Sequence, residues 1–370
     1  MKKSIWLVCL MLVLLPMGAG AEAAPSSEQF DPELAQTALQ IAEMCYLPSM
    51  QASVLSVSGY RQVGLYNMDR EPDDSRHVAA YALYDRVTED ERTEVIIAIR
   101  GTGEGEWKLN LDLMPSGNYD LPYAENFALA AEDILSTHQA YLDTLVSPVF
   151  LITGHSRGAA VANILGARLT DRFQAENVFV YTFATPRTVR GEYPAYSNIF
   201  NVINPADLVT YLPFPQWGFQ RYGIDVELPA EDAALLPMAQ AAYAQRTDQT
   251  GPFVSSLGRT VETQKIILAM ANLAPDVETG FQLRHALSHP GEATTDEPGM
   301  TADAFMLMLL SGGMTMNQAP SADVSSIMQT QNDFTPLLSV SLFSDADEST
   351  TWIASMHMPA TYGAWMSALQ

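Results

Sequence analysis

The feature that most constrains this 370-residue chain is the pentapeptide Gly-His-Ser-Arg-Gly at residues 154–158. The apolar run 149–152 precedes it, and the helix-like stretch 159–165 follows it. A serine between a buried strand and a helix predicts a tight turn that holds the Ser156 hydroxyl clear of the sheet. Such a turn brings the positions two before and two after the serine together, so glycines are expected there. The alternative is a tight strand–helix turn whose exposed serine takes part in no chemistry.

The composition indicates a folded protein with an acidic surface. Apolar residues make up 48% of the chain, which is enough for a substantial core in one large domain or two smaller ones. The formal net charge is −24, and a surface this acidic repels nucleic acid and anionic membranes. We therefore expect no nucleic-acid partner.

Residues 1–23 have the pattern of a secretory signal peptide. Two lysines precede the apolar stretch 4–15, and small residues suit cleavage near Ala21 or Ala23. The apolar stretch is shorter than the roughly 18 residues of a membrane-spanning helix, so we expect a secreted, extracellular protein without stable membrane insertion. Only Cys45 would remain after cleavage, which leaves no intramolecular disulfide.

Strand-like and helix-like segments alternate through the first part of the chain. The predicted strands cover residues 78–87, 94–99, 149–152, 178–183 and 199–203, and the predicted helices cover residues 32–46, 127–145 and 159–165. This alternation predicts an α/β fold, a mostly parallel central sheet with helices on both faces.

The pattern changes after Leu228. The predicted helices there cover residues 231–246, 260–274 and 301–310. We expect residues 24–370 to form one domain, with residues 229–349 as a helical insert or cap before the C-terminal histidine. Ordinary surface helices are the alternative for this segment, and residues 334–343 are a candidate final strand.

A serine hydroxyl is a poor nucleophile at neutral pH unless a base accepts its proton and a carboxylate orients that base. When the serine lies on a strand-to-helix turn, the acid follows it in the chain and the histidine comes last. This order leaves His285, His289 and His357 as possible bases. We predict His357, which lies in a loop-like stretch near the C-terminus. His285 and His289 are four residues apart on a predicted helix without a third ligand, so we expect no metal site.

The acid is expected in the loop after a strand that follows the serine. Asp207 fits this position, because the sequence Asn-Pro-Ala-Asp comes directly after the strand 199–203. Asp225 is the second candidate, although it lies within a strand-like stretch. The alternative role for Asp207 is to cap a loop, which is common for an aspartate after Asn-Pro.

Acyl transfer also requires hydrogen-bond donors for the oxyanion that forms on the substrate. One expected donor is the backbone N–H of Arg157, immediately after the serine. The other is Thr102, in the loop Arg100-Gly101-Thr102-Gly103 that follows the strand 94–99. Its backbone N–H and its hydroxyl are both donors. An ordinary glycine-rich turn is the alternative for this loop.

Several segments match one family in order along the chain. They are Ala98 to Thr102, Trp107 with Asn110, Thr153 to Gly158, Asn204 to Asp207 with Leu212-Pro213, and His357 with Tyr362, while the early helix and Ser58-Gly59-Tyr60 fit the family's N-terminal region. With these segments the chain resembles the class 3 lipases, the fungal-lipase-like branch of the α/β-hydrolases. The resemblance implies a triad of Ser156, Asp207 and His357. It also implies an oxyanion hole made by Thr102 and Arg157, and no cofactor.

The chain departs from the fungal pattern in several places, one of which is that residues 122–127 replace the family's usual histidine-containing stretch. Arg157 follows the serine where the fungal enzymes usually carry leucine, and Ala159 replaces a frequent second glycine. Neither change removes a needed group, because only the backbone N–H acts at position 157. The long insert 229–349 is not a standard part of the family.

Together these features predict a secreted serine carboxylester hydrolase, a triacylglycerol lipase or lipid esterase. Its expected partner is a lipid or ester substrate, including one at a lipid–water interface, and no cofactor or metal is expected. A phospholipase and an esterase of small soluble esters are the alternatives among enzymes. A secreted binding protein on an inactive hydrolase scaffold is the alternative from another class.

Overall fold

The computed structural model describes residues 25–68, 79–101, 124–246, 253–273, 275–276, 278 and 351–368. Within these residues a seven-stranded sheet has the order β1-β2-β3-β4-β5-β7-β9. Its strands are β1 (Arg61–Tyr66), β2 (Tyr81–Val87), β3 (Thr93–Ile99), β4 (Pro148–His155), β5 (Val178–Phe183), β7 (Ile199–Ile203) and β9 (Ile224–Glu227). A separate two-stranded sheet pairs β6 (Val189–Arg190) with β8 (Phe219–Gln220).

Most of the large sheet is parallel. Strands β3, β4, β5, β7 and β9 pair in parallel, and β1 and β2 add an antiparallel edge. The carboxyl ends of the five parallel strands therefore lie at one edge of the sheet, where parallel α/β folds place their functional sites. The predicted α/β-hydrolase architecture is confirmed, with a mostly parallel sheet between helices.

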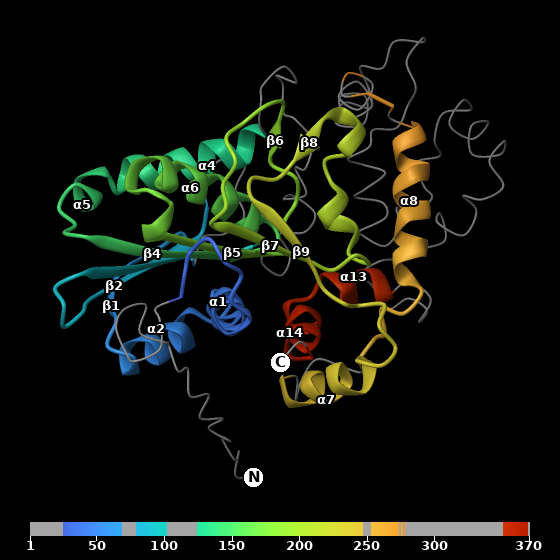
Figure 1. The fold of residues 1–370 in the computed structure, drawn as a ribbon, viewed down its shortest axis with the longest axis horizontal. Helices are drawn as coiled ribbons and strands as arrows, with labels where there is room; N and C mark the ends of the chain where they lie inside the picture. The colour runs from blue at the N-terminus through green and yellow to red at the C-terminus, as the bar shows by residue number, and fades with distance from the viewer. Residues whose placement is uncertain are drawn as a thin grey trace, which may run out of the picture.

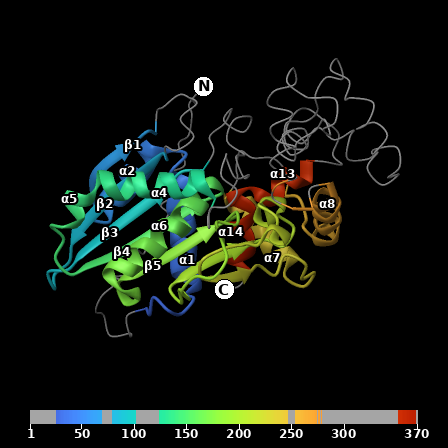
Figure 2. The ribbon, with the colours of Figure 1, turned by 90° about the horizontal axis from the view of Figure 1, so that it is seen from above.

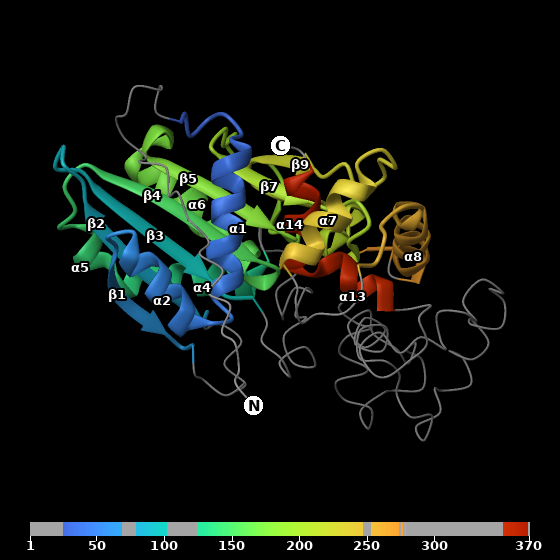
Figure 3. The ribbon, with the colours of Figure 1, turned by 90° about the horizontal axis from the view of Figure 1, so that it is seen from below.

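Helices cover both faces of this sheet (Figure 1). The helices of the described residues are α1 (Pro32–Met44), α2 (Pro48–Val57), α4 (Glu125–Thr137), α5 (Gln139–Leu142), α6 (Arg157–Phe173), α7 (Leu236–Arg246), α8 (Arg259–Leu273), α13 (Thr351–His357) and α14 (Pro359–Ser367). Figure 2 shows α4 and α6 in front of the sheet, and Figure 3, from the opposite side, shows α1, α2, α7 and α14 in front.

The two layers of helices produce two hydrophobic cores. Successive residues of a strand point to opposite faces, so Ile97 packs in the core under α4 and α6, and Ile96 packs in the core under α1 and α14. Every residue of β5 is buried, as expected for a central strand covered on both faces.

Three local predictions need correction. His357 is the last residue of helix α13 and not part of a loop. Met358 separates this helix from α14, which begins at Pro359. The predicted helix 127–145 is two helices, because the chain turns at His138. The edge strand β1 was not predicted, because it lacks a continuous apolar run: half of its six residues are exposed, and the others are only partly buried.

The helices α7 and α8 agree with two of the three helices predicted in the segment 229–349. Contacts join α7 to α14, and α8 lies beyond the β9 edge of the sheet (Figures 1 and 3). The predicted helix 301–310 and strand 334–343 lie outside the described residues. Within the part of the chain that the structure describes, no helix has the length and apolar character needed to span a membrane.

Candidate active site

Ser156 occupies the turn between β4 and α6. Its backbone has φ 57° and ψ −127°, a strained conformation for a residue with a side chain. The Ser156 N–H donates a 3.0 Å hydrogen bond to the carbonyl of Phe183, at the end of the neighbouring strand. A Cβ atom on Gly154 would lie 2.5 Å from the carbonyl carbon of Gly158, so the expected need for glycine in this turn is confirmed.

His357 lies between Ser156 and Asp207. Its Nε2 is 2.8 Å from Ser156 Oγ, and its Nδ1 is 2.8 Å from Asp207 Oδ2. All three side chains are buried. The structure thus brings together the three residues predicted to act as nucleophile, base and acid, although 201 residues separate Ser156 from His357 along the chain. A hydroxyl, an imidazole and a carboxylate in this order form a proton-transfer chain.

The carboxylate of Asp207 is held at both oxygens. Asp207 caps the short 3-10 helix η2 (Leu208–Tyr211), and its Oδ1 accepts a 3.0 Å hydrogen bond from the Val209 N–H. Its Oδ2 accepts from the Tyr362 hydroxyl at 2.7 Å as well as from His357. Asp207 therefore both caps a loop, which was the alternative role for it, and bonds to His357.

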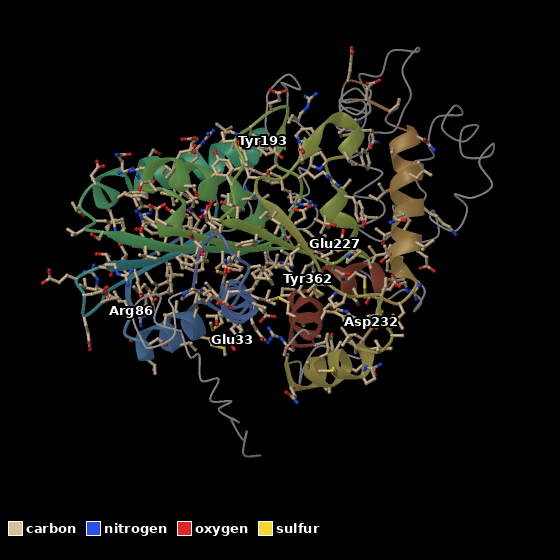
Figure 4. The ribbon with its side chains drawn as sticks, viewed as in Figure 1. Glu33, Arg86, Tyr193, Glu227, Asp232 and Tyr362 are labelled. Atoms are coloured by element: carbon tan, nitrogen blue, oxygen red, sulfur yellow. The ribbon has the colours of Figure 1, made fainter. Side chains whose placement is uncertain are left out.

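Tyr362 and Asn204 are site residues to which the sequence assigned no role. Burial and the neighbouring charge of Asp207 raise the pKa of Tyr362 well above its ordinary value, so its hydroxyl remains a donor. The Asn204 side chain donates to the carbonyl of Met356 at 3.0 Å, which ties the loop of Asp207 to α13. Tyr362 points from α14 toward the sheet (Figure 4). The only available signal for Tyr362 was the family resemblance, which matched it together with His357 but gave it no role.

The second aspartate candidate lies elsewhere. The carboxylate of Asp225 accepts from Arg221 at 2.6 Å and from Asn201 at 3.1 Å, and no hydrogen bond joins it to His357. His285 and His289 lie outside the described residues. Within the described part of the chain, no group of His, Cys, Asp and Glu side chains is placed to hold a metal ion.

Of the two predicted oxyanion donors, the structure describes Arg157 but not Thr102. Arg157 is the first residue of α6, so its backbone N–H belongs to the helix terminus, where amide groups lack partners within the helix. Thr102 lies outside the described residues, but the residue before it lies beside the serine. A Cβ atom on Gly101 would be 3.3 Å from the Cβ of Ser156.

Comparison with known families agrees with this geometry. The model of the family described as Lipase (class 3) matches residues 96–217. This region runs from β3 to η3 (Pro215–Trp217) and contains Ser156 and Asp207. Over these residues the chain is similar to the class 3 lipase family.

Among solved structures, the chain is similar to fungal lipases. A Rhizomucor miehei lipase in a propeptide complex shares 17% identity with a TM-score of 0.42, over 53% of this chain and 66% of that one. Rhizomucor miehei triacylglyceride lipase shares 18% identity with a TM-score of 0.40, over 53% and 79%. The lipase of Rhizopus microsporus var. chinensis shares 14% identity with a TM-score of 0.41, over 58% and 79%.

Proposed function

We propose that this protein is a secreted serine carboxylester hydrolase that acts on lipid esters, most directly as a triacylglycerol lipase. The observation that carries the proposal is the buried hydrogen-bonded chain from Ser156 through His357 to Asp207, beside the N-terminus of α6. A phospholipase or an esterase of small esters would use the same chain of residues, so the ester itself has to be determined by assay.

In the proposed reaction, Ser156 Oγ attacks the ester carbonyl carbon while Nε2 of His357 accepts the hydroxyl proton. Asp207 stabilises the imidazolium that forms. The backbone N–H of Arg157 and Thr102 would bind the oxyanion of the tetrahedral intermediate. His357 then donates its proton to the departing alcohol, which leaves an acyl ester on the serine. Water, activated by the same histidine, attacks this ester and releases the fatty acid, so both half-reactions balance without a cofactor.

Two measurements test this proposal. A fluorophosphonate probe should label Ser156 in wild-type protein, and absence of labelling would favour a binding protein on an inactive scaffold. A panel of esters of graded acyl length, assayed below and above the solubility limit, should show the highest kcat/KM with lipid esters. Preference for short soluble esters would identify an esterase, and preference for phospholipids a phospholipase.

A prediction concerns the hydroxyl of Thr102. Thr102→Val keeps the shape of the side chain and removes its O–H, so kcat should fall about 10²-fold if that hydroxyl binds the oxyanion. KM should change little, because the donor acts on charge that develops during the reaction. Unchanged kcat in steady-state assays would assign the donation at this position to the backbone alone.

Exposed apolar side chains near the site support action at a lipid–water interface. Met358 follows His357 and is 42% exposed. Leu47 and Met50, at the start of α2, are 58% and 51% exposed. Leu47 is next to Tyr46, whose hydroxyl reaches the residue before Ser156. Large apolar side chains exposed together around a site are typical of surfaces that contact lipid or other partners.

We predict that Leu47→Asp combined with Met50→Asp lowers activity on emulsified lipid by about tenfold or more, because both charges oppose transfer of this surface into lipid. Activity on a monomeric soluble ester should stay within about twofold, since aspartate is well accepted at a helix cap and in the first turn. The matched control is Val57→Asp, at the far end of α2, where the side chain is 90% exposed. Equal losses in both variants would contradict an interfacial role for residues 47 and 50.

The proposal also includes secretion and the domain arrangement. Residues 1–23 would be removed as a signal peptide near Ala21 or Ala23, and residues 229–349 would be a helical insert within the hydrolase domain 24–370. N-terminal sequencing of protein collected from the culture medium tests whether residues 1–23 are removed. An N-terminus that still contains the residues before Ala21 would overturn it.

A further inference from the structure

The histidine beside the nucleophile, His155, is buried and bonded on both ring nitrogens. It is the last residue of β4, immediately before Ser156. Its Nε2 is 2.8 Å from the main-chain carbonyl oxygen of His357, and its Nδ1 is 3.3 Å from the hydroxyl of Tyr46. The two imidazole rings lie 4.9 Å apart. Chain order excludes His155 as the base, and the reaction proposed above gives it no role.

These partners leave one arrangement of protons on His155. A carbonyl oxygen only accepts hydrogen bonds, so Nε2 must carry the proton that is shared with His357. In the neutral ring Nδ1 is then an acceptor, and the Tyr46 hydroxyl is its donor. Burial, and the charge that His357 gains when protonated, lower the pKa of His155 well below its ordinary value. The neutral ring with its proton on Nε2 is therefore the favoured form.

The bond from His155 adds to the hydrogen bonds that hold the end of α13, where Asn204 donates to the carbonyl of Met356 and Thr361 donates to the carbonyl of Ser355. His357 is the last residue of α13, and the final carbonyls of a helix have no partner within it. With this bond, His357 is held at three atoms: Nδ1 by Asp207, Nε2 by Ser156, and its main-chain oxygen by His155. Two of the three partners are adjacent residues of one rigid turn.

This arrangement sets the separation of nucleophile and base. His357 follows its partner His155 by 202 residues, so the chain between them does not by itself align the ring. Proton transfer requires the ring to remain within hydrogen-bond reach of Ser156 Oγ. A turn that bonds both the ring and the main chain of His357 keeps that distance short.

We propose that His155 is a positioning residue that fixes the main chain of His357, with Tyr46 holding its required tautomer. The proposal rests on the proposed hydrolase function, because it acts through the base of that reaction. The opposing interpretation is that His155 is a buried histidine whose hydrogen bonds stabilise only the fold.

Four variants separate these interpretations. His155→Phe keeps a ring and removes both nitrogens, whereas His155→Gln restores an N–H donor near the position of Nε2. Tyr46→Phe removes only the hydroxyl that fixes the tautomer. The matched control is His138→Phe, a second buried histidine, bonded to Tyr81 at 2.9 Å in the core on the other face of the sheet.

We expect His155→Phe to lower kcat for a soluble ester by about 10- to 100-fold with KM within about threefold, since small misplacements of a catalytic group cost this much. His155→Gln should recover most of the loss, and Tyr46→Phe should show a smaller one. The far-downfield proton resonance of His357 Nδ1–H should weaken or shift in His155→Phe and stay unchanged in His138→Phe, even where both variants lose similar thermal stability.

Wild-type kcat and an unchanged resonance in His155→Phe would overturn the proposal. Equal losses in the phenylalanine and glutamine variants would overturn it as well, because the donated hydrogen bond would then not be the cause. Failure of the proposed hydrolase function gives a different result. The fluorophosphonate would not label wild-type protein, while the His357 resonance would still respond to the residue at position 155.

Discussion

Ser156→Ala should lower kcat for ester hydrolysis by about 10⁴-fold or more and leave the fold intact. The Ser156 hydroxyl is the group placed 2.8 Å from Nε2 of His357, and alanine offers no nucleophile there. The strained backbone of the turn is retained, because alanine has the same backbone requirements as serine. The loss in stability should be about 1 kcal/mol, for one buried hydrogen bond.

Steady-state kinetics on freshly purified protein, together with thermal unfolding, measure both parts of this prediction. The fluorophosphonate should fail to label the alanine variant. Activity within tenfold of wild type would exclude Ser156 as the nucleophile. A large loss of thermal stability alongside the loss of activity would instead mean that the turn itself had changed.

The second large effect concerns the base and its acid. His357→Ala should lower kcat by about 10⁴-fold or more, whereas His285→Ala and His289→Ala should leave it near the wild-type value. The reason is that the structure places His357, between the serine and a buried carboxylate, at hydrogen-bond distance from both. The three variants are to be assayed side by side on the same soluble ester.

The acid has its own matched pair. Asp207→Asn should lower kcat by about 10⁴-fold, because an amide in place of the carboxylate favours the wrong tautomer of His357. Asp225→Asn, at the second candidate acid, should keep activity near that of wild type, since Asp225 bonds to Arg221 and Asn201 and not to the histidine.

For the histidine variants, an inactive His285→Ala with an active His357→Ala would reverse the assignment of the base and give the segment 229–349 a direct role.

The turn around Ser156 could be predicted from the sequence because its determinants are local. The strand before the serine, the helix after it and the two glycines lie within a few residues of one another, and each acts through short-range sterics or hydrophobic periodicity. The same holds for the strands 178–183 and 199–203, whose mostly apolar stretches match β5 and β7. The loop that carries Asp207 could be placed because it follows directly on the second of these strands.

Other parts of the site depend on contacts between distant segments. No local pattern indicates that Tyr362 donates to Asp207, 155 residues earlier, or that Asn204 reaches the carbonyl of Met356. The helical state of His357 was missed for a similar reason. Helix α14 packs against α7 and α1, and α13 packs against α14 and η2. These tertiary contacts stabilise both short helices, since helices of this length gain little from local propensity alone.

The sequence by itself therefore determined the strands β2, β3, β4, β5 and β7 of the sheet, the strained serine turn and the order in which the acid and the histidine follow it. Only the tertiary structure decided how His357 is held. Its ring and main chain are bonded by three residues from two distant parts of the chain, and one of them, His155, was excluded as a base by chain order alone. Short-range sterics and periodicity are encoded within a few residues. Hydrogen bonds across 150 or more residues form only once the folded layers have brought their donors and acceptors together.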